Sequence, residues 1–250
     1  MRTPKERIAY ALSTYYEGMG FKFICQNLWQ KYNCYPSEST FYEWKDRFTK
    51  QAIEYSEKDK PQVGKVWIAL VSPIKIGDDH VWFWDIFDVK TRFCLASHLS
   101  EQLTQNDARM ILTQAVKRVG QLPKVVFTDG PITWIEGLKL EYNGECRRVI
   151  QKNPLNTAGV RILKQFRSNL NVRNIIIKRL KNLNSVRFMI HGWQVHYNYL
   201  RPYEILNNCT PAYQANIRRS RLSREVMKYY VNDFWSLWST TMKFNKLEFP

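Results

Sequence analysis

The sequence of 250 residues lacks any apolar run long enough to cross a bilayer. A membrane-spanning helix needs about 20 predominantly apolar residues. The first ten residues, MRTPKERIAY, also lack the apolar core of a signal peptide. We therefore expect no membrane partner and a cytoplasmic location.

The cysteines lack the spacing of a metal site or a disulfide scaffold. No pair forms CxxC, and no histidine follows at zinc-finger spacing. Small, thinly spread cysteines of this kind usually behave as buried apolar side chains. We expect reduced thiols at all five positions, which are Cys25, Cys34, Cys94, Cys146 and Cys209.

A long stretch of the chain lacks acidic residues altogether. The formal net charge is +16, and residues 146–203 contain no Asp or Glu. A solvated basic face is the simpler interpretation, but such faces usually mix both signs, and a one-sign segment suits a phosphate backbone. The cations of this stretch are Arg147, Arg148, Lys152, Arg161, Lys164, Arg167, Arg173, Lys178, Arg179, Lys181, Arg187 and Arg201.

The first third of the chain does contain a clear apolar periodicity. A spacing near 3.6 residues predicts three helices, at residues 6–16, 21–32 and 38–50. The second helix is expected to bury one face, which carries Phe23, Ile24, Leu28 and Trp29.

A short turn before the third helix favours a helix-turn-helix domain over residues 1–56. Pro36 interrupts the chain, and Ser37 can cap the helix that follows. A plain helical bundle is the alternative. In a helix-turn-helix the third helix would enter the major groove of double-stranded DNA. Its candidate contacts are Ser39, Thr40, Glu43, Lys45 and Arg47.

Strand signals begin after a polar linker at residues 57–65. Hairpin patterns predict strands at 66–76, 81–88 and 93–99, followed by a helix at 105–119 and a strand at 125–128. Three hairpin strands, a helix and a further strand indicate an α/β domain over residues 66–215, with an RNase H-like mixed sheet flanked by helices.

The remaining helical patterns lie at residues 158–170, 185–199 and 223–240. The last belongs to an aromatic C-terminal segment, residues 216–250, whose wide apolar stripe must be covered. It either packs on the sheet domain or forms the interface of a homodimer.

Several motifs resemble those of insertion-sequence transposases of the DDE superfamily. Residues 37–44, SESTFYEW, resemble the recognition helix of that family. Residues 125–130, VVFTDG, resemble the strand that bears its second catalytic Asp. Further along, HGWQVHYNYLRPYEIL and CTPAYQA resemble its closing motifs. The resemblance implies a helix-turn-helix, an RNase H-like domain, and two synapsed copies bound to DNA.

That family works with two metal ions held by three carboxylates. Asp129 matches the second of these. The first strand should read W..DET..K, but Leu70 stands at the Asp position. The Glu of the later helix is replaced by Lys164, whose ammonium would repel a metal ion. The resemblance therefore leaves Asp129 as a vestigial residue without its partners.

The sequence favours a DNA-binding protein derived from a transposase, catalytically inactive and without a cofactor, with an architectural, nucleoid or regulatory role. An alternative is an active transposase or nuclease with a shifted Mg²⁺ site built on Asp129 and Asp85. If Leu70 pairs near Phe87, Asp85 lies on the same face of the sheet. The simpler interpretation of Asp85 is a pairing with a nearby Arg or Lys, and a folded copy without a role is a third hypothesis.

Overall fold

The structure is a computed structural model that describes residues 3–128, 136–137, 147–150, 164, 166–167, 170–201, 203–207 and 209–217. For residues 5–6 and 147–150 it describes the backbone. The described residues form two compact units, which meet along the chain between Ser56 and Glu57.

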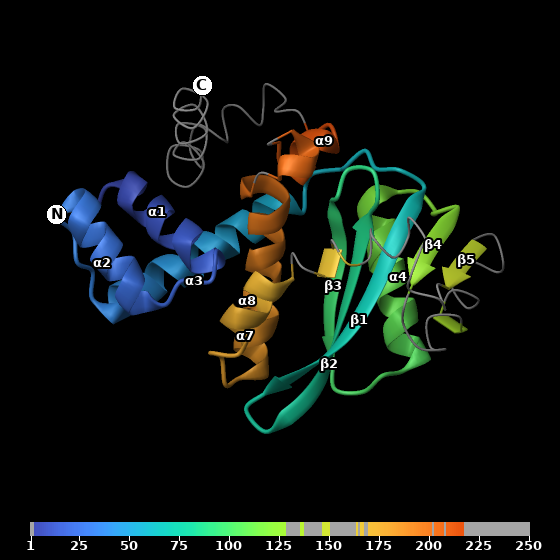
Figure 1. Ribbon diagram of the computed structural model, residues 1–250, viewed down its shortest axis with the longest axis horizontal. Helices are drawn as coiled ribbons and strands as arrows, with labels where there is room; N and C mark the ends of the chain where they lie inside the picture. The colour runs from blue at the N-terminus through green and yellow to red at the C-terminus, as the bar shows by residue number, and fades with distance from the viewer. Residues whose placement is uncertain are drawn as a thin grey trace. The chain divides into compact units, whose positions relative to one another are not determined.

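The N-terminal unit consists of three helices, α1 (Lys5–Tyr16), α2 (Phe21–Tyr32) and α3 (Glu38–Ser56) (Figure 1). Asn33 adopts the left-handed conformation that ends α2. Ser37 then accepts a hydrogen bond from the Thr40 N–H at 3.2 Å, so it caps α3 as predicted. The third helix extends six residues beyond the predicted end at residue 50.

The predicted buried face of α2 is wrong in part. Ile24 and Leu28 are fully buried, but Phe23 and Trp29 are 65% and 56% exposed. At about 100° per residue, Phe23 lies opposite the stripe through Ile24, Cys25 and Leu28, whereas Trp29 lies at the edge of that stripe next to Cys25. Apolar character alone placed both side chains in the core.

The second unit contains a five-stranded sheet of β1 (Val66–Ile76), β2 (Asp79–Asp88), β3 (Cys94–Ser100), β4 (Val125–Thr128) and β5 (Arg147–Ile150). The strand order is β3-β2-β1-β4-β5. The first three strands are antiparallel, whereas β4 runs parallel to β1 and β5 parallel to β4. This is an RNase H-like mixed sheet, which confirms the predicted fold; β5 itself was not predicted.

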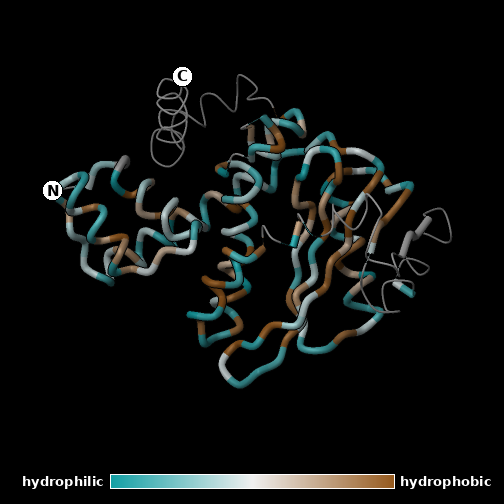
Figure 2. Tube along the Cα trace, viewed as in Figure 1, coloured by the Kyte–Doolittle hydropathy of each residue, from teal (hydrophilic) through white to brown (hydrophobic). Residues whose placement is uncertain are grey.

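Helices cover both faces of this sheet. One face contributes Trp67, Ala69 and Trp84 to a core with α4 (Gln105–Val119). The opposite face meets α7 (Asn171–Ile177) and α8 (Leu183–Val195), where Phe83 lies against Arg173. Hydrophobic colour runs along the central strands in Figure 2. Because residues alternate along a strand, each side chain of β1 belongs to one of these two layers.

After α8 the helix widens into a π-helix, η1 (His196–Leu200), where an α-helix was predicted to continue. Asn198 in this turn accepts a hydrogen bond from the Cys94 N–H at 2.8 Å and donates one to the Cys94 carbonyl at 2.9 Å. One side chain thus completes the backbone hydrogen bonding where β3 begins. The short helices η2 (Glu204–Leu206) and α9 (Pro211–Gln214) follow.

The predicted linker is bound to the sheet unit along part of its length. The Gln62 N–H donates to the Ala215 carbonyl at 2.8 Å, and the Gly64 N–H donates to Asp88 at 2.9 Å. Within the described ranges, no helix is long and apolar enough to cross a membrane. The predicted C-terminal helix at residues 223–240 lies outside those ranges.

Candidate functional site

The first catalytic position of the resembled family falls at the centre of the sheet. Leu70 on β1 is buried and pairs directly with Asp85 on β2. The predicted partner, Phe87, pairs instead with Ile68, so the expected register was wrong by two residues. Directly paired residues share a face of the sheet, so Leu70 and Asp85 both point toward the layer of α7 and α8.

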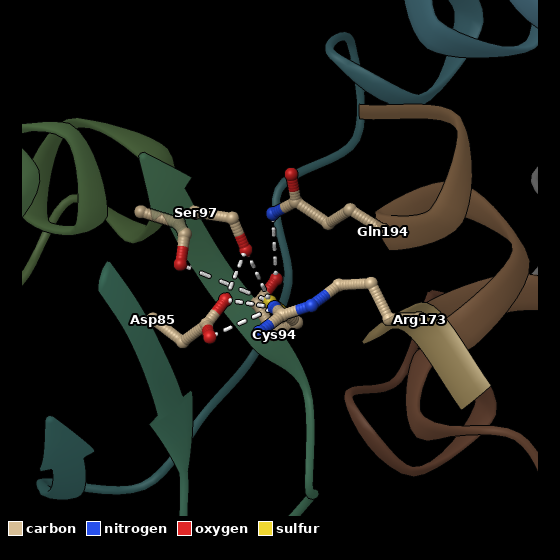
Figure 3. Close-up of polar contacts among 6 residues, drawn as sticks. Asp85, Cys94, Ser97, Arg173 and Gln194 are labelled. Atoms are coloured by element: carbon tan, nitrogen blue, oxygen red, sulfur yellow. Dashed lines mark hydrogen bonds and ion pairs between the residues drawn. The ribbon is translucent and has the colours of Figure 1, made fainter. Parts of the chain in front are cut away.

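Asp85 is occupied by a cation from within the protein. The Arg173 Nη1 group donates to Asp85 Oδ1 and Oδ2 at 2.7 and 2.8 Å. The Ser97 hydroxyl donates to Oδ1 at 2.7 Å. Figure 3 shows Asp85 and Ser97 on their strands, with Arg173 reaching them from α7. The carboxylate therefore has its charge balanced and three hydrogen bonds supplied.

This ion pair is sealed from solvent. The Arg173 side chain is 0% exposed and that of Asp85 1% exposed. The Arg173 guanidinium lies 3.7 Å from the ring centre of Phe83 and 5.1 Å from that of Trp193. Among the residues that the structure describes, its Nε and Nη2 atoms have no hydrogen-bond partner, and the contacts that stabilise the guanidinium there come from Asp85 and the two aromatic faces.

A thiol lies beside the pair. Cys94 Sγ is 3.4 Å from Ser97 Oγ, and the Gln194 amide donates to the Cys94 carbonyl at 3.1 Å (Figure 3). Burial, reinforced by the charge of Asp85, raises the pKa of the Cys94 thiol far above its ordinary value. The thiol stays protonated, as expected for a reduced structural cysteine.

Two predicted roles are corrected by this geometry. Arg173 was expected to contact DNA, but a fully buried guanidinium cannot reach a phosphate. Asp85 was considered as a metal ligand, but Arg173 occupies its carboxylate and a divalent ion there would be repelled by the guanidinium. Both residues belong to an internal ion pair, the simpler interpretation of Asp85.

The other predicted metal positions are only partly described. Asp129 lies outside the described residues, and so does Arg161. Lys164 is helical and exposed, and its ammonium group offers no oxygen ligand to a metal ion. No three His, Cys, Asp or Glu side chains are grouped to hold a metal among the residues that could be searched, which exclude Asp129. The described residues therefore do not fit a two-metal centre.

Exposed cations gather around the end of α7. Lys178, Arg179 and Lys181 follow that helix within four residues and are all exposed, as is Arg167 before it. Cations at a helix C-terminus also interact favourably with the helix dipole. The backbone of Arg147 and Arg148 forms the start of β5, at the opposite edge of the sheet from β3.

The side chains on α3 that were predicted to contact DNA differ in their exposure and in their contacts within the protein. Ser39 and Thr40 hydroxyls lie 2.9 and 2.7 Å from the capping hydroxyl of Ser37. Lys45 pairs with Asp46 at 2.9 Å and has only 14% of its side chain exposed. Glu43 and Arg47 are exposed. The outer face of α3 thus carries both charge signs.

The sequence contained a signal for the buried pair that was missed. Arg173 falls at helical spacing with Leu170, Ile176 and Ile177, all of which are buried. A cation on an apolar helical face needs a buried acid as partner. Asp85 stands in an apolar strand and needs a buried cation, and the packing of α7 on the sheet brings the two together.

Scans of this sequence against protein-family models and against curated proteins give no match. Solved structures do show likeness in fold. A simian T-cell lymphotropic virus intasome in complex with PP2A regulatory subunit B56 gamma has 12% identity and a TM-score of 0.48 over 64% of this chain. The match covers 58% of that chain, less than two thirds of its length.

Two integrase catalytic core domains show similar likeness. The HTLV-2 domain in complex with magnesium has 14% identity and a TM-score of 0.44, over 62% of this chain and 97% of that one. The BIV domain has 13% identity and a TM-score of 0.44, over 66% of this chain and 99% of that one.

Proposed function

We propose that this protein binds double-stranded DNA, descends from a DDE-type transposase, and has lost strand-transfer chemistry. The observation that carries the proposal is the buried Asp85–Arg173 pair opposite Leu70. An internal cation takes up the carboxylate of Asp85, which pairs directly with the first metal-ligand position, Leu70. A second candidate, a nuclease using Asp129 and Asp85 with Mg²⁺, would need that carboxylate free.

The charge of the chain supports the binding part of the proposal. The formal net charge is +16, which favours polyanionic partners. In the described part of the sheet unit, exposed cations at Lys178, Arg179 and Lys181 have no acid near them in sequence. Direct contacts from such side chains would replace metal-mediated contacts to phosphates.

The helical unit supports a recognition role. A turn of five residues, Asn33 to Ser37, joins α2 to α3. On this proposal α3 is the recognition helix, with the exposed Glu43 and Arg47 able to meet base edges. The protein would act as a homodimer associated with the nucleoid, in an architectural or regulatory role.

A nicking assay tests the loss of chemistry. Wild-type protein is incubated with supercoiled DNA in Mg²⁺ and in Mn²⁺, and Asp129→Ala serves as the matched variant. We expect no nicking above the buffer control. Nicking that Asp129→Ala abolishes would refute the inactive assignment and favour the nuclease.

The salt dependence of affinity tests the binding. For a 20-base-pair duplex, log Kd should change steeply with log salt, by about 0.9 per phosphate contact. Changing Lys178, Arg179 and Lys181 to Gln should lower that slope. Tyr213→Leu should leave it unchanged, because this exposed side chain carries no charge. A flat wild-type dependence would overturn the proposal.

A further inference from the structure

The aromatic side chains of the helical unit fall into two groups. Most are buried or have a ring or cation beside them. Tyr10 packs edge-on against Tyr32 at 5.8 Å, with the Lys31 ammonium 4.7 Å from the Tyr10 ring centre. Phe21 stacks on Tyr42 at 6.4 Å. Burial and pairing of this kind are the ordinary fate of aromatic rings in a small helical core.

Three rings form the second group and are named here the aromatic surface: Phe23, Trp29 and Tyr35. Their exposed fractions are 65%, 56% and 61%. Within the described residues no ring or cation contact is found for them. Phe23 and Trp29 are both exposed on α2, six residues apart, and Tyr35 lies in the turn that follows. Large rings that are this exposed leave their faces open to a binding partner.

The segment that carries these rings is also cationic. From Gly18 to Ser37 the chain has no Asp or Glu, and Lys22 and Lys31 are both exposed. A partner must therefore offer flat apolar groups together with negative charge. Unstacked nucleotides combine both in one repeating unit, with base faces for the rings and phosphates for the lysines.

We propose that the aromatic surface binds single-stranded DNA by stacking of bases on Phe23, Trp29 and Tyr35. The inference rests on the proposed function for the class of ligand, nucleic acid. It uses none of the residues assigned to α3 or to the basic end of α7. The protein would then hold duplex through its basic residues and an unpaired strand through α2 and its turn, as required at a melted or distorted site.

Fluorescence anisotropy with a labelled 20-nucleotide oligothymidylate tests the proposal, with full-length protein throughout. Trp29→Leu keeps an apolar side chain and removes the aromatic face, and we expect about 5- to 150-fold weaker binding. Trp29→Phe keeps an aromatic face and should retain most of the affinity. Phe23→Leu and Tyr35→Leu should each weaken binding in the same range. Because all three side chains are exposed, far-UV circular dichroism should show unchanged folding.

Two controls make the test specific. Tyr213→Leu removes an equally exposed tyrosine, 61% exposed, from the sheet unit and should change nothing. Affinity of the leucine variants for a 20-base-pair duplex should stay within about twofold, since duplex binding is assigned to other residues.

The outcomes separate this inference from the function on which it rests. Unchanged oligothymidylate affinity in Trp29→Leu, with duplex binding intact, would overturn the inference and leave the function standing. Loss of self-association in the leucine variants, seen by light scattering without loss of strand binding, would identify a protein interface instead. Absence of both single-strand and duplex binding by wild-type protein would refute the function itself.

Discussion

At the scale of single residues, Asp85 and Arg173 make the sharpest prediction. Removing one partner of a buried ion pair leaves an unpaired charge, so Asp85→Leu or Arg173→Met should each lower the free energy of unfolding by about 3–5 kcal/mol. The double variant replaces both charges with apolar side chains and should be far more stable than the sum of the single changes implies. Urea unfolding of all four proteins measures the coupling.

A matched change at the surface serves as the control for that comparison of four proteins. Lys178→Met alters an exposed cation on the turn after α7, and its effect on unfolding should stay within about 0.5 kcal/mol. Additive effects of the Asp85 and Arg173 changes would mean that the two charges do not depend on each other. In that case the ion pair could not explain why the carboxylate is withdrawn from a metal site.

Two histidines of the sheet unit predict how stability depends on pH. Burial lowers the pKa of His98, against the opposing effect of Asp107 at 3.5 Å, and burial also lowers the pKa of His191, with Glu57 opposing. The positive charge of Arg187 lowers the pKa of His98 further, and that of His98 lowers the pKa of His191 further. A lowered folded pKa means that the unfolded chain binds more protons below about pH 6.5.

Stability should therefore be full above about pH 6.5 and fall as the pH drops toward the folded pKa values, by at most about 1.4 kcal/mol per pH unit for the half-buried His98 and by much less for His191, whose exposed side chain is screened by solvent. His98→Gln and His191→Gln should flatten urea unfolding free energies measured between pH 5 and 8. A profile that Gln at positions 98 and 191 leaves unchanged would contradict this assignment.

At the scale of elements, the contact between η1 and β3 depends on the side-chain amide of Asn198. Asn198→Ala would leave the N–H and carbonyl of Cys94 without that side chain, although Gln194 still donates to the carbonyl. A buried polar group that loses its partner costs about 1–3 kcal/mol. We expect a destabilisation in that range by urea unfolding. Asn184→Ala, at an exposed position of α8, should have little effect, and an equal loss there would show that the amide is not special.

Elements differed in how far the sequence could predict them. The strand at 66–76, the helix at 105–119 and the strand at 125–128 were predicted at their observed bounds, because local periodicity and turn residues define them. The register of β2 and the helix α7 were missed. The β2 register follows from the two-residue turn between the paired residues Ile76 and Asp79, whereas the turn was expected at Asp78 and Asp79. The place of α7 depends instead on a contact between residues 88 positions apart, Asp85 and Arg173. Local patterns carry no information about such pairings.

The sequence predicted which types of residue form the candidate site better than it predicted where each of them lies in the structure. Leu70 and Lys164 follow from the motif alone, and exposure of Lys178, Arg179 and Lys181 agrees with a basic surface. Burial of Arg173 could not be read from charge, since the same residue type serves both a phosphate backbone and an internal carboxylate. Exposure of Phe23 and Trp29 likewise contradicts the apolar pattern, because hydropathy does not record which side of a helix has a neighbour.

At the scale of the whole molecule, the two units should divide the work of DNA binding. The described part of the sheet unit has its own core on both faces of β1, and its linker is bound to Ala215 and Asp88. Deleting residues 1–56 should therefore leave a folded protein that still binds duplex DNA through its cations. Sequence preference should be lost if α3 is the recognition helix, as proposed.

Selection from a randomised duplex library, followed by competition with unrelated duplex, measures that preference for both proteins. The full chain should discriminate and the shortened chain should not, whereas the salt dependence of non-specific affinity should change little. Preference that survives the deletion would assign sequence reading to the sheet unit and refute the role of α3. Loss of all duplex binding would instead place the phosphate contacts on the helical unit, whose α3 surface carries both charge signs and would have to bind against its own acids.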